Sequence, residues 1–169
     1  RVLRLGANQF TGKIPAFHDL NVLDTLDISN NALTGQIPSN FLSLITTTAD
    51  LEVDLASNVL TGTIPVELDR FDRVTLYLRE NNIVGLSSSF CDNVGWNSGD
   101  VESYGCNGIL CPPGTFNSFG RARGASVCLQ CNSDNTYYGQ VECNPSSTAS
   151  PLMAWSLGAI AFLVCLYCM

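Results

Sequence analysis

Apolar and polar positions recur along the first 90 residues at a regular interval. The fullest copy of the pattern runs Leu23-x-x-Leu26-x-Ile28-x-x-Asn31-x-Leu33-Thr34-Gly35-x-Ile37-Pro38. Four copies aligned on their asparagine are spaced 23, 27 and 23 residues apart, at Asn8, Asn31, Asn58 and Asn81. A repeat of this length predicts a stacked solenoid in which each copy is one structural unit.

Each copy predicts one short strand, because alternate residues of a strand face the same side. The residues expected in the core are Leu3 with Leu5, Leu26 with Ile28, Val53 with Leu55, and Leu76 with Leu78. The asparagine that follows each strand can donate to and accept from backbone groups that the turn leaves unpaired. We therefore interpret the four asparagines as a structural ladder.

Three copies carry the motif Thr-Gly-x-Ile-Pro, at residues 11–15, 34–38 and 61–65. This form resembles the plant-type leucine-rich repeat of receptor-like proteins and receptor kinases. The resemblance covers residues 1–90 and implies an α/β solenoid with short parallel strands. Because the chain opens inside a predicted strand, we expect further repeats upstream. The fourth copy lacks the motif at residues 84–87, which predicts a terminal cap over residues 91–110.

Six cysteines follow the repeats, at Cys91, Cys106, Cys111, Cys128, Cys131 and Cys143. An even number at this density predicts a disulfide framework formed in an oxidising compartment. Sequence alone leaves the connectivity open. Pairing of neighbours is one arrangement, with Cys91 and Cys106 closing the repeat stack and the other four cysteines paired among themselves.

Residues 106–143 contain Cys-Pro-Pro-Gly-Thr-Phe from Cys111, Gly120-Arg121, and Cys128-Leu-Gln-Cys131. These motifs resemble small cysteine-rich ectodomain modules of the EGF-like or ephrin-receptor type. A Cys-x-x-Cys pair can also be a redox motif or half of a zinc site. Neither fits well, since no βαβ pattern surrounds the pair and the single histidine, His18, lies far upstream. We predict structural disulfides, no metal site and no cofactor.

The last part of the chain changes composition twice. Residues 144–151 form a small polar linker, and residues 152–169 carry no charged side chain. We expect an apolar C-terminal helix of about 27 Å there, close to the lower limit for crossing a bilayer. A glycosylphosphatidylinositol (GPI) signal is the alternative, because such a signal ends in an apolar tail preceded by small residues.

Charge and motif content exclude several function classes. The formal net charge is −7, and acidic residues outnumber basic ones by 10 to 6 within residues 1–90. An acidic surface without a basic patch argues against nucleic acid as a partner. The chain has no phosphate-binding loop, kinase motif or nucleophile elbow, so we predict that it is not an enzyme.

The concave strand face is the usual binding surface of a solenoid. Its central column is predicted to consist of Arg4, Asp27, Asp54 and Tyr77. Neighbouring strands lie about 4.8 Å apart, so the like charges of Asp27 and Asp54 repel each other unless a basic peptide or a cation offsets them. Tyr77 is the candidate aromatic anchor. The alternative interpretation is a solvated charged edge that only keeps the protein soluble.

The preferred function is recognition at the cell surface, with the ectodomain outside the plasma membrane. By the resemblance, the protein binds an extracellular peptide, protein or glycan and has no kinase domain in this chain. A lateral co-receptor is implied. The alternative is a structural cell-wall or adhesion protein held by a GPI anchor. We also considered a soluble inhibitor of wall-degrading enzymes and an oxidoreductase that uses Cys128 and Cys131.

Overall fold

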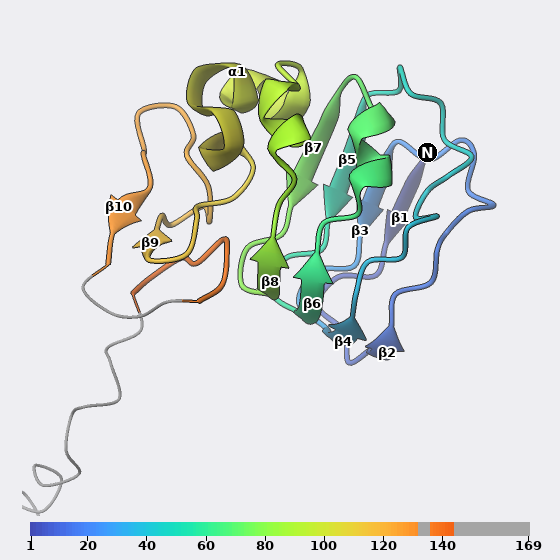
Figure 1. The fold of residues 1–169 in the computed structure, drawn as a ribbon. Helices are drawn as coiled ribbons and strands as arrows, with labels where there is room; N and C mark the ends of the chain where they lie inside the picture. The colour runs from blue at the N-terminus through green and yellow to red at the C-terminus, as the bar shows by residue number, and fades with distance from the viewer. Residues whose placement is uncertain (132–135, 144–169) are drawn as a thin grey trace, which may run out of the picture.

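The repeats stack into a solenoid built from two parallel sheets. The computed structural model describes residues 1–131 and 136–143. One sheet has the strand order β1-β3-β5-β7 and the other has the order β2-β4-β6-β8, so each repeat contributes one strand to each sheet (Figure 1). The strands of the first sheet are β1 (Val2–Arg4), β3 (Thr25–Asp27), β5 (Leu51–Asp54) and β7 (Val74–Tyr77). Those of the second are β2 (Thr11–Lys13), β4 (Ala32–Gly35), β6 (Val59–Thr63) and β8 (Asn82–Gly85).

The hydrophobic core fills the interior of this stack. The predicted inward residues of the three later strands are buried, and Leu26 and Leu55 have no exposed surface. Leu3 and Leu5 are only partly buried, because β1 is the edge strand of its sheet. The predicted parallel strands are confirmed, and stacking of neighbouring repeats is what removes their apolar faces from water.

The α/β part of the predicted fold class is wrong, since the repeats form a β-solenoid. The Thr-Gly segments lie in the strands of the second sheet, and the described part of the repeats contains no α-helix. The convex element of the third repeat is a 3₁₀-helix, η1 (Val66–Arg70). β-Branched threonine favours the extended backbone. Gly12, Gly35 and Gly62 supply φ angles of 86°, 79° and 79°, which allow the chain to bend within these strands or at their end.

A compact cap covers the last repeat. It consists of η2 (Ser88–Asp92), η3 (Trp96–Gly99), α1 (Asp100–Tyr104) and η4 (Gly105–Gly108). Trp96 is fully buried, packs 5.1 Å from the Phe90 ring and donates its indole N–H to the Phe71 carbonyl at 2.7 Å. The Cys91–Cys106 disulfide joins the two ends of this cap. The cap therefore closes the apolar end of the stack.

The cysteine-rich module contains one antiparallel hairpin, formed by β9 (Thr115–Phe116) and β10 (Leu129–Gln130). Its disulfides are Cys111–Cys128 and Cys131–Cys143. The predicted disulfide framework is confirmed, and the six cysteines pair with their neighbours in sequence. Because Cys128 and Cys131 belong to different disulfides, they form neither a dithiol pair nor half of a zinc site.

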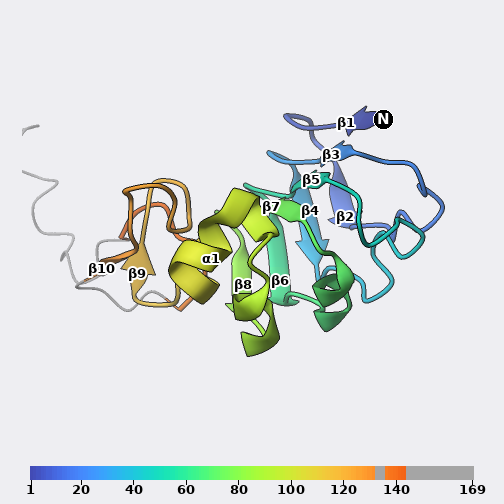
Figure 2. The same ribbon diagram turned by 90° about the horizontal axis from the view of Figure 1, so that it is seen from above.

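The module packs directly against the fourth repeat. The Tyr138 amide donates to the Ile83 carbonyl at 2.9 Å, and the Gly139 carbonyl accepts from the Glu80 amide at 3.2 Å. In both ribbon views the module lies beside β7 and β8, beyond the cap (Figures 1 and 2). The module thus extends the solenoid by hydrogen bonding to its last turn.

The predicted linker at 144–151 and the predicted membrane segment at 152–169 lie outside the described residues. Among residues 1–131 and 136–143, no helix has the length and apolar character needed to cross a membrane.

Candidate ligand-binding face

A ladder of asparagines sets the shape of the concave face. The Asn58 amide group donates to the carbonyls of Ile28, Leu55 and Ala56 at 3.1, 3.2 and 3.3 Å. Its side-chain oxygen accepts from the Leu33 amide at 3.0 Å. Each such asparagine therefore satisfies backbone groups of two neighbouring repeats, which holds the turns after the strands in a fixed position.

The other ladder positions show how the pattern depends on stacking. Asn31 and Asn81 make the same set of bonds, also to groups of two repeats. Asn8 is exposed and donates only to Leu5 and Gly6 within its own repeat.

One buried structural asparagine was missed by the sequence analysis. Asn97 is fully buried, accepts from the Leu76 amide at 2.8 Å and donates to the Gly108 carbonyl at 2.8 Å. It follows Asn81 by 16 residues, which breaks the repeat interval, so periodicity could not find it. Asn97 therefore joins the last strand of the first sheet, β7, to the cap.

The predicted central column forms one continuous row. The strand register pairs Arg4 with Asp27, Asp27 with Asp54, and Asp54 with Tyr77. Arg4 is exposed, whereas Asp27, Asp54 and Tyr77 are half-buried. The two aspartates are therefore neighbours, with a cation on one side and an aromatic ring on the other.

Both aspartates also have a local structural role. Asp27 accepts from the Ser29 amide at 3.0 Å, and Asp54 accepts from the Ala56 amide at 2.9 Å. These bonds fix the turn that follows each strand. This structural role explains in part why two aspartates stand side by side. Burial raises the pKa of Asp54, the Ala56 bond opposes that rise, and the charge of Asp27 adds to it.

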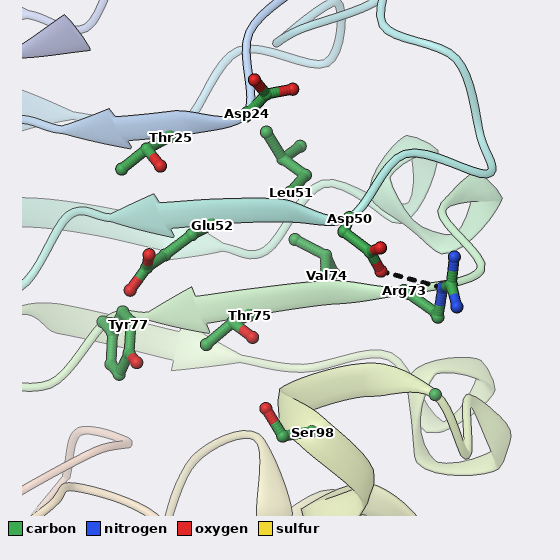
Figure 3. A pocket seen from close by; sticks show the side chains of 11 residues that line it. Asp24, Thr25, Asp50, Leu51, Glu52, Arg73, Val74, Thr75, Tyr77 and Ser98 are labelled. Carbon is green, nitrogen blue, oxygen red and sulfur yellow. Dashed lines mark ion pairs between the residues drawn. The ribbon is translucent and has the colours of Figure 1, made fainter. Parts of the chain in front are cut away.

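A groove of about 490 Å³ runs across the amino-terminal ends of the strands of this sheet. Its lining residues come from three successive repeats and from the cap: Asp24, Thr25, Asp50, Leu51, Glu52, Arg73, Val74, Thr75, Tyr77, Gly95 and Ser98. Figure 3 shows these side chains on β3, β5 and β7 or just before them, with Ser98 on the cap side. Asp24, Asp50 and Arg73 were not predicted, although each stands directly before a strand where a periodic reading could have placed it.

The groove is acidic. It holds three carboxylates and one guanidinium, and Arg73 is 2.9 Å from Asp50 (Figure 3). Asp24 is exposed and stands directly before β3. Glu52 is exposed and makes no ion pair within the described residues. In the same part of the chain, no group of three or more His, Cys, Asp or Glu side chains could hold a metal ion. The groove is thus suited to a positively charged or hydrogen-bonding ligand.

Comparison with known proteins identifies the repeats. Residues 22–44 match the family model described as Leucine Rich Repeat. A stretch of 43 residues is 54% identical to Pollen receptor-like kinase 2 of Arabidopsis thaliana. The repeats form a plant leucine-rich repeat domain. They are related to the ectodomains of leucine-rich repeat receptor-like kinases. The match covers 25% of this chain and only 6% of that kinase, so the chain spans a small part of the relative's length.

Two solved structures match part of this chain. A plant ice-binding protein is 32% identical, with a TM-score of 0.47, over 52% of this chain and 27% of its own. The Arabidopsis receptor kinase HAESA, solved with the peptide hormone IDA and the co-receptor SERK1, is 26% identical with a TM-score of 0.41. That match covers 58% of this chain and 17% of HAESA.

Proposed function

We propose that this leucine-rich repeat domain is a cell-surface recognition domain that binds a basic extracellular peptide segment along its concave groove. The single observation that carries the proposal is the acidic groove, which lies on the concave strand face and spans three repeats. Carboxylates placed around a groove attract cationic ligands and raise their association rate. The relation of the repeats to receptor-like kinase ectodomains supports a receptor-type role.

The charge of the groove and of the row of aspartates beside it argues for a peptide rather than an acidic glycan. Glu52 and Asp54 lie on one strand, β5, in the middle of the sheet, with Asp27 beside Asp54. A polyanionic sugar chain would be repelled by these side chains, whereas Lys or Arg residues of a peptide would relieve their mutual repulsion. In this proposal the protein performs no catalysis, and any signal passes through a partner such as a lateral co-receptor.

The test displays the full chain on a cell surface and measures binding of fluorescent peptides that have one length and differ only in net charge. We expect the basic peptides to bind most tightly. A Glu52→Gln, Asp24→Asn double variant, which removes two exposed carboxylates of the groove, should weaken their binding roughly fivefold, as expected for two solvent-accessible charges. Glu67→Gln is the matched control, because Glu67 is an exposed acid on η1 outside the groove. Affinity that is independent of peptide charge would refute the proposal.

We also propose that residues 152–169 attach the protein to the membrane. Treatment of cells with phosphatidylinositol-specific phospholipase C distinguishes the two forms of attachment. Release of the displayed protein identifies a GPI anchor, and retention identifies a spanning segment. Recovery of the untreated protein in the medium would exclude both.

A further inference from the structure

A second cavity lies where the concave face meets the cysteine-rich module. It has a volume of about 260 Å³ and is lined by Asp54, Tyr77, Arg79, Phe119, Arg121 and Arg123. We call it the junction pocket. Tyr77 lines both this pocket and the acidic groove, so the two cavities are neighbours on one surface. The loop that carries residues 119–123 comes from the module, which lies beside β7 and β8 in Figure 1.

Three of the eight basic residues of the chain gather in the junction pocket, and among the described residues only Arg121 forms an ion pair with a carboxylate. Arg121 is buried, lies 2.6 Å from an Asp100 carboxylate oxygen and stands over the Tyr77 ring at 5.6 Å. This pair fixes one wall of the pocket. Arg121 therefore positions the site and is not itself available to a ligand.

The other two guanidinium groups are less constrained. Arg79 is half-buried and donates to the Ser118 carbonyl at 3.5 Å. Arg123 is exposed, stands 5.7 Å over the Phe119 ring and makes no ion pair within the described residues. Burial lowers the pKa of Arg121, and the positive charge of Arg123 lowers it further, so the cations are close enough to repel each other. Asp54 is the one carboxylate among the lining residues.

We propose that the junction pocket binds a carboxylate of the peptide whose basic part occupies the acidic groove. A guanidinium binds a carboxylate through two parallel hydrogen bonds, and the exposed Phe119 ring holds the Arg123 fork in place. The inference rests on the proposed function for the identity of the ligand. It adds that the ligand is polarised, with basic residues along the groove and one acidic group beyond Tyr77.

The module therefore contributes to the binding surface instead of only covering the last repeat. Arg123 and Phe119 lie on it, whereas Arg79 lies just past β7. Removing the module would take away Arg121 and Arg123, which are two of the three arginines of the pocket, and would leave Arg79 beside Asp54. The carboxylate has two sources, the end of a chain or an Asp or Glu side chain, and both present the same two oxygens.

The test uses small carboxylates that lack a basic part. N-Acetylglycine carries a terminal carboxylate, N-acetylglutamate α-amide carries only a side-chain carboxylate, and N-acetylglycinamide is the uncharged control. They are titrated into the full, disulfide-bonded chain while arginine Nε–Hε resonances are followed by NMR. We expect saturable shifts at Arg79 and Arg123 with roughly millimolar affinity for the carboxylates. The tighter of the two carboxylates identifies the source, and equal affinity means that the pocket recognises the carboxylate alone.

Arg123→Gln should weaken carboxylate binding at least about fivefold, because one of the two charge-assisted contacts is lost. Lys13→Gln is the matched control, since Lys13 is an exposed cation on the second sheet. Thermal melting establishes that both variants fold. Equal shifts with the uncharged amide, or unchanged affinity in Arg123→Gln, would overturn the inference.

The two proposals fail in different ways. If basic peptides bind the groove but are indifferent to Arg123→Gln and to their own carboxylate, the junction pocket is refuted and the recognition function stands. If N-acetylglycine binds the pocket while no peptide binds the displayed chain, the pocket stands and the proposed peptide recognition is refuted.

Discussion

The repeat stack and the cysteine-rich module achieve stability in different ways. The stack, with its cap, buries a continuous set of large apolar side chains from Ile14 to Leu110. Beyond Leu110, the buried apolar residues of the described chain are Cys111, Ala122 and Cys131. Larger side chains of the module, Phe119 and Leu129 among them, are 45% and 54% exposed. The stack is held by its hydrophobic core, and the module is held by disulfides and polar contacts.

This difference shows what each part can contribute to a binding site. A core of stacked repeats provides rigid rows of side chains at the spacing of the strands. The module has no hydrophobic core of large side chains, so its long side chains remain at the surface. Arginine and phenylalanine side chains of the module therefore lie at the edge of the groove. Its polar anchor, Arg121 with Asp100, substitutes for apolar packing at the interface.

The largest expected effect comes from removing a disulfide, which should destabilise the module and leave the repeat stack unchanged. Cys111→Ser combined with Cys128→Ser should cost about 2–5 kcal/mol within the module, which has little apolar burial to compensate. In hydrogen exchange, the amides of Ala122 and Cys131, which bond to Asn107 and Gly114, should lose protection. Amides of β3, β5 and β7 should retain theirs. Loss of protection throughout the chain would show that the two regions unfold as one unit.

The second prediction concerns the ion pair between the regions. Arg121→Met should destabilise the junction by roughly 3 kcal/mol, because it leaves the Asp100 carboxylate, which is 15% exposed, without its partner. The Arg121→Met, Asp100→Asn double variant should recover part of this loss. Denaturant unfolding of the single and double variants gives the coupling energy. Additive effects would mean that the pair contributes little to docking.

The third prediction tests the ladder of the repeat stack. Asn58→Ala removes four hydrogen bonds and leaves buried backbone groups unpaired, which should cost about 2 kcal/mol or more. Asn8→Ala is the matched control at the exposed end, with an expected cost below about 0.5 kcal/mol. Urea denaturation measures both. Equal costs would mean that stacking does not strengthen the ladder.

The smallest predicted effect depends on pH. The pKa of Asp54 is raised above its ordinary value of 3.8, chiefly by burial. Between pH 3.8 and the raised value, the folded state binds more protons than the unfolded state, so stability falls as pH rises through this window. Asp54→Asn should therefore be more stable at pH 7, by less than about 1 kcal/mol because solvent still reaches the group. The Asn oxygen can keep the bond to Ala56.

Thermal melting from pH 3 to pH 7 checks this prediction, and the advantage of the variant should vanish at the acidic end. Glu67→Gln, an exposed change on η1, serves as the control, because Glu67 is not among the groups that shift the pKa of Asp54. A variant that is less stable at pH 7 would show that the Asp54 charge stabilises the turn by more than its burial costs.

Several features were readable before the structure because they repeat. The interval between asparagines located the strands of the first sheet, and alternation within each strand identified inward residues such as Leu55 and outward residues such as Asp54. The register that pairs Asp54 with Tyr77 follows from the same interval. The even set of cysteines predicted disulfides. These are local or periodic properties, so the role of a position in one copy of the repeat can be inferred from the aligned positions in the other copies.

The sequence by itself determined the stacked repeats, the row of charges on their concave face and the need for a disulfide-bonded cap. Only the tertiary structure decided that Thr-Gly segments form a second sheet, that Asn97 joins β7 to the cap, and that Arg121 and Arg123 line one pocket with Tyr77. The reason is physical. A periodic pattern is enforced by identical neighbours along the stack, whereas the docking of an aperiodic module depends on contacts between residues about 40 positions apart, such as Arg79 and Ser118.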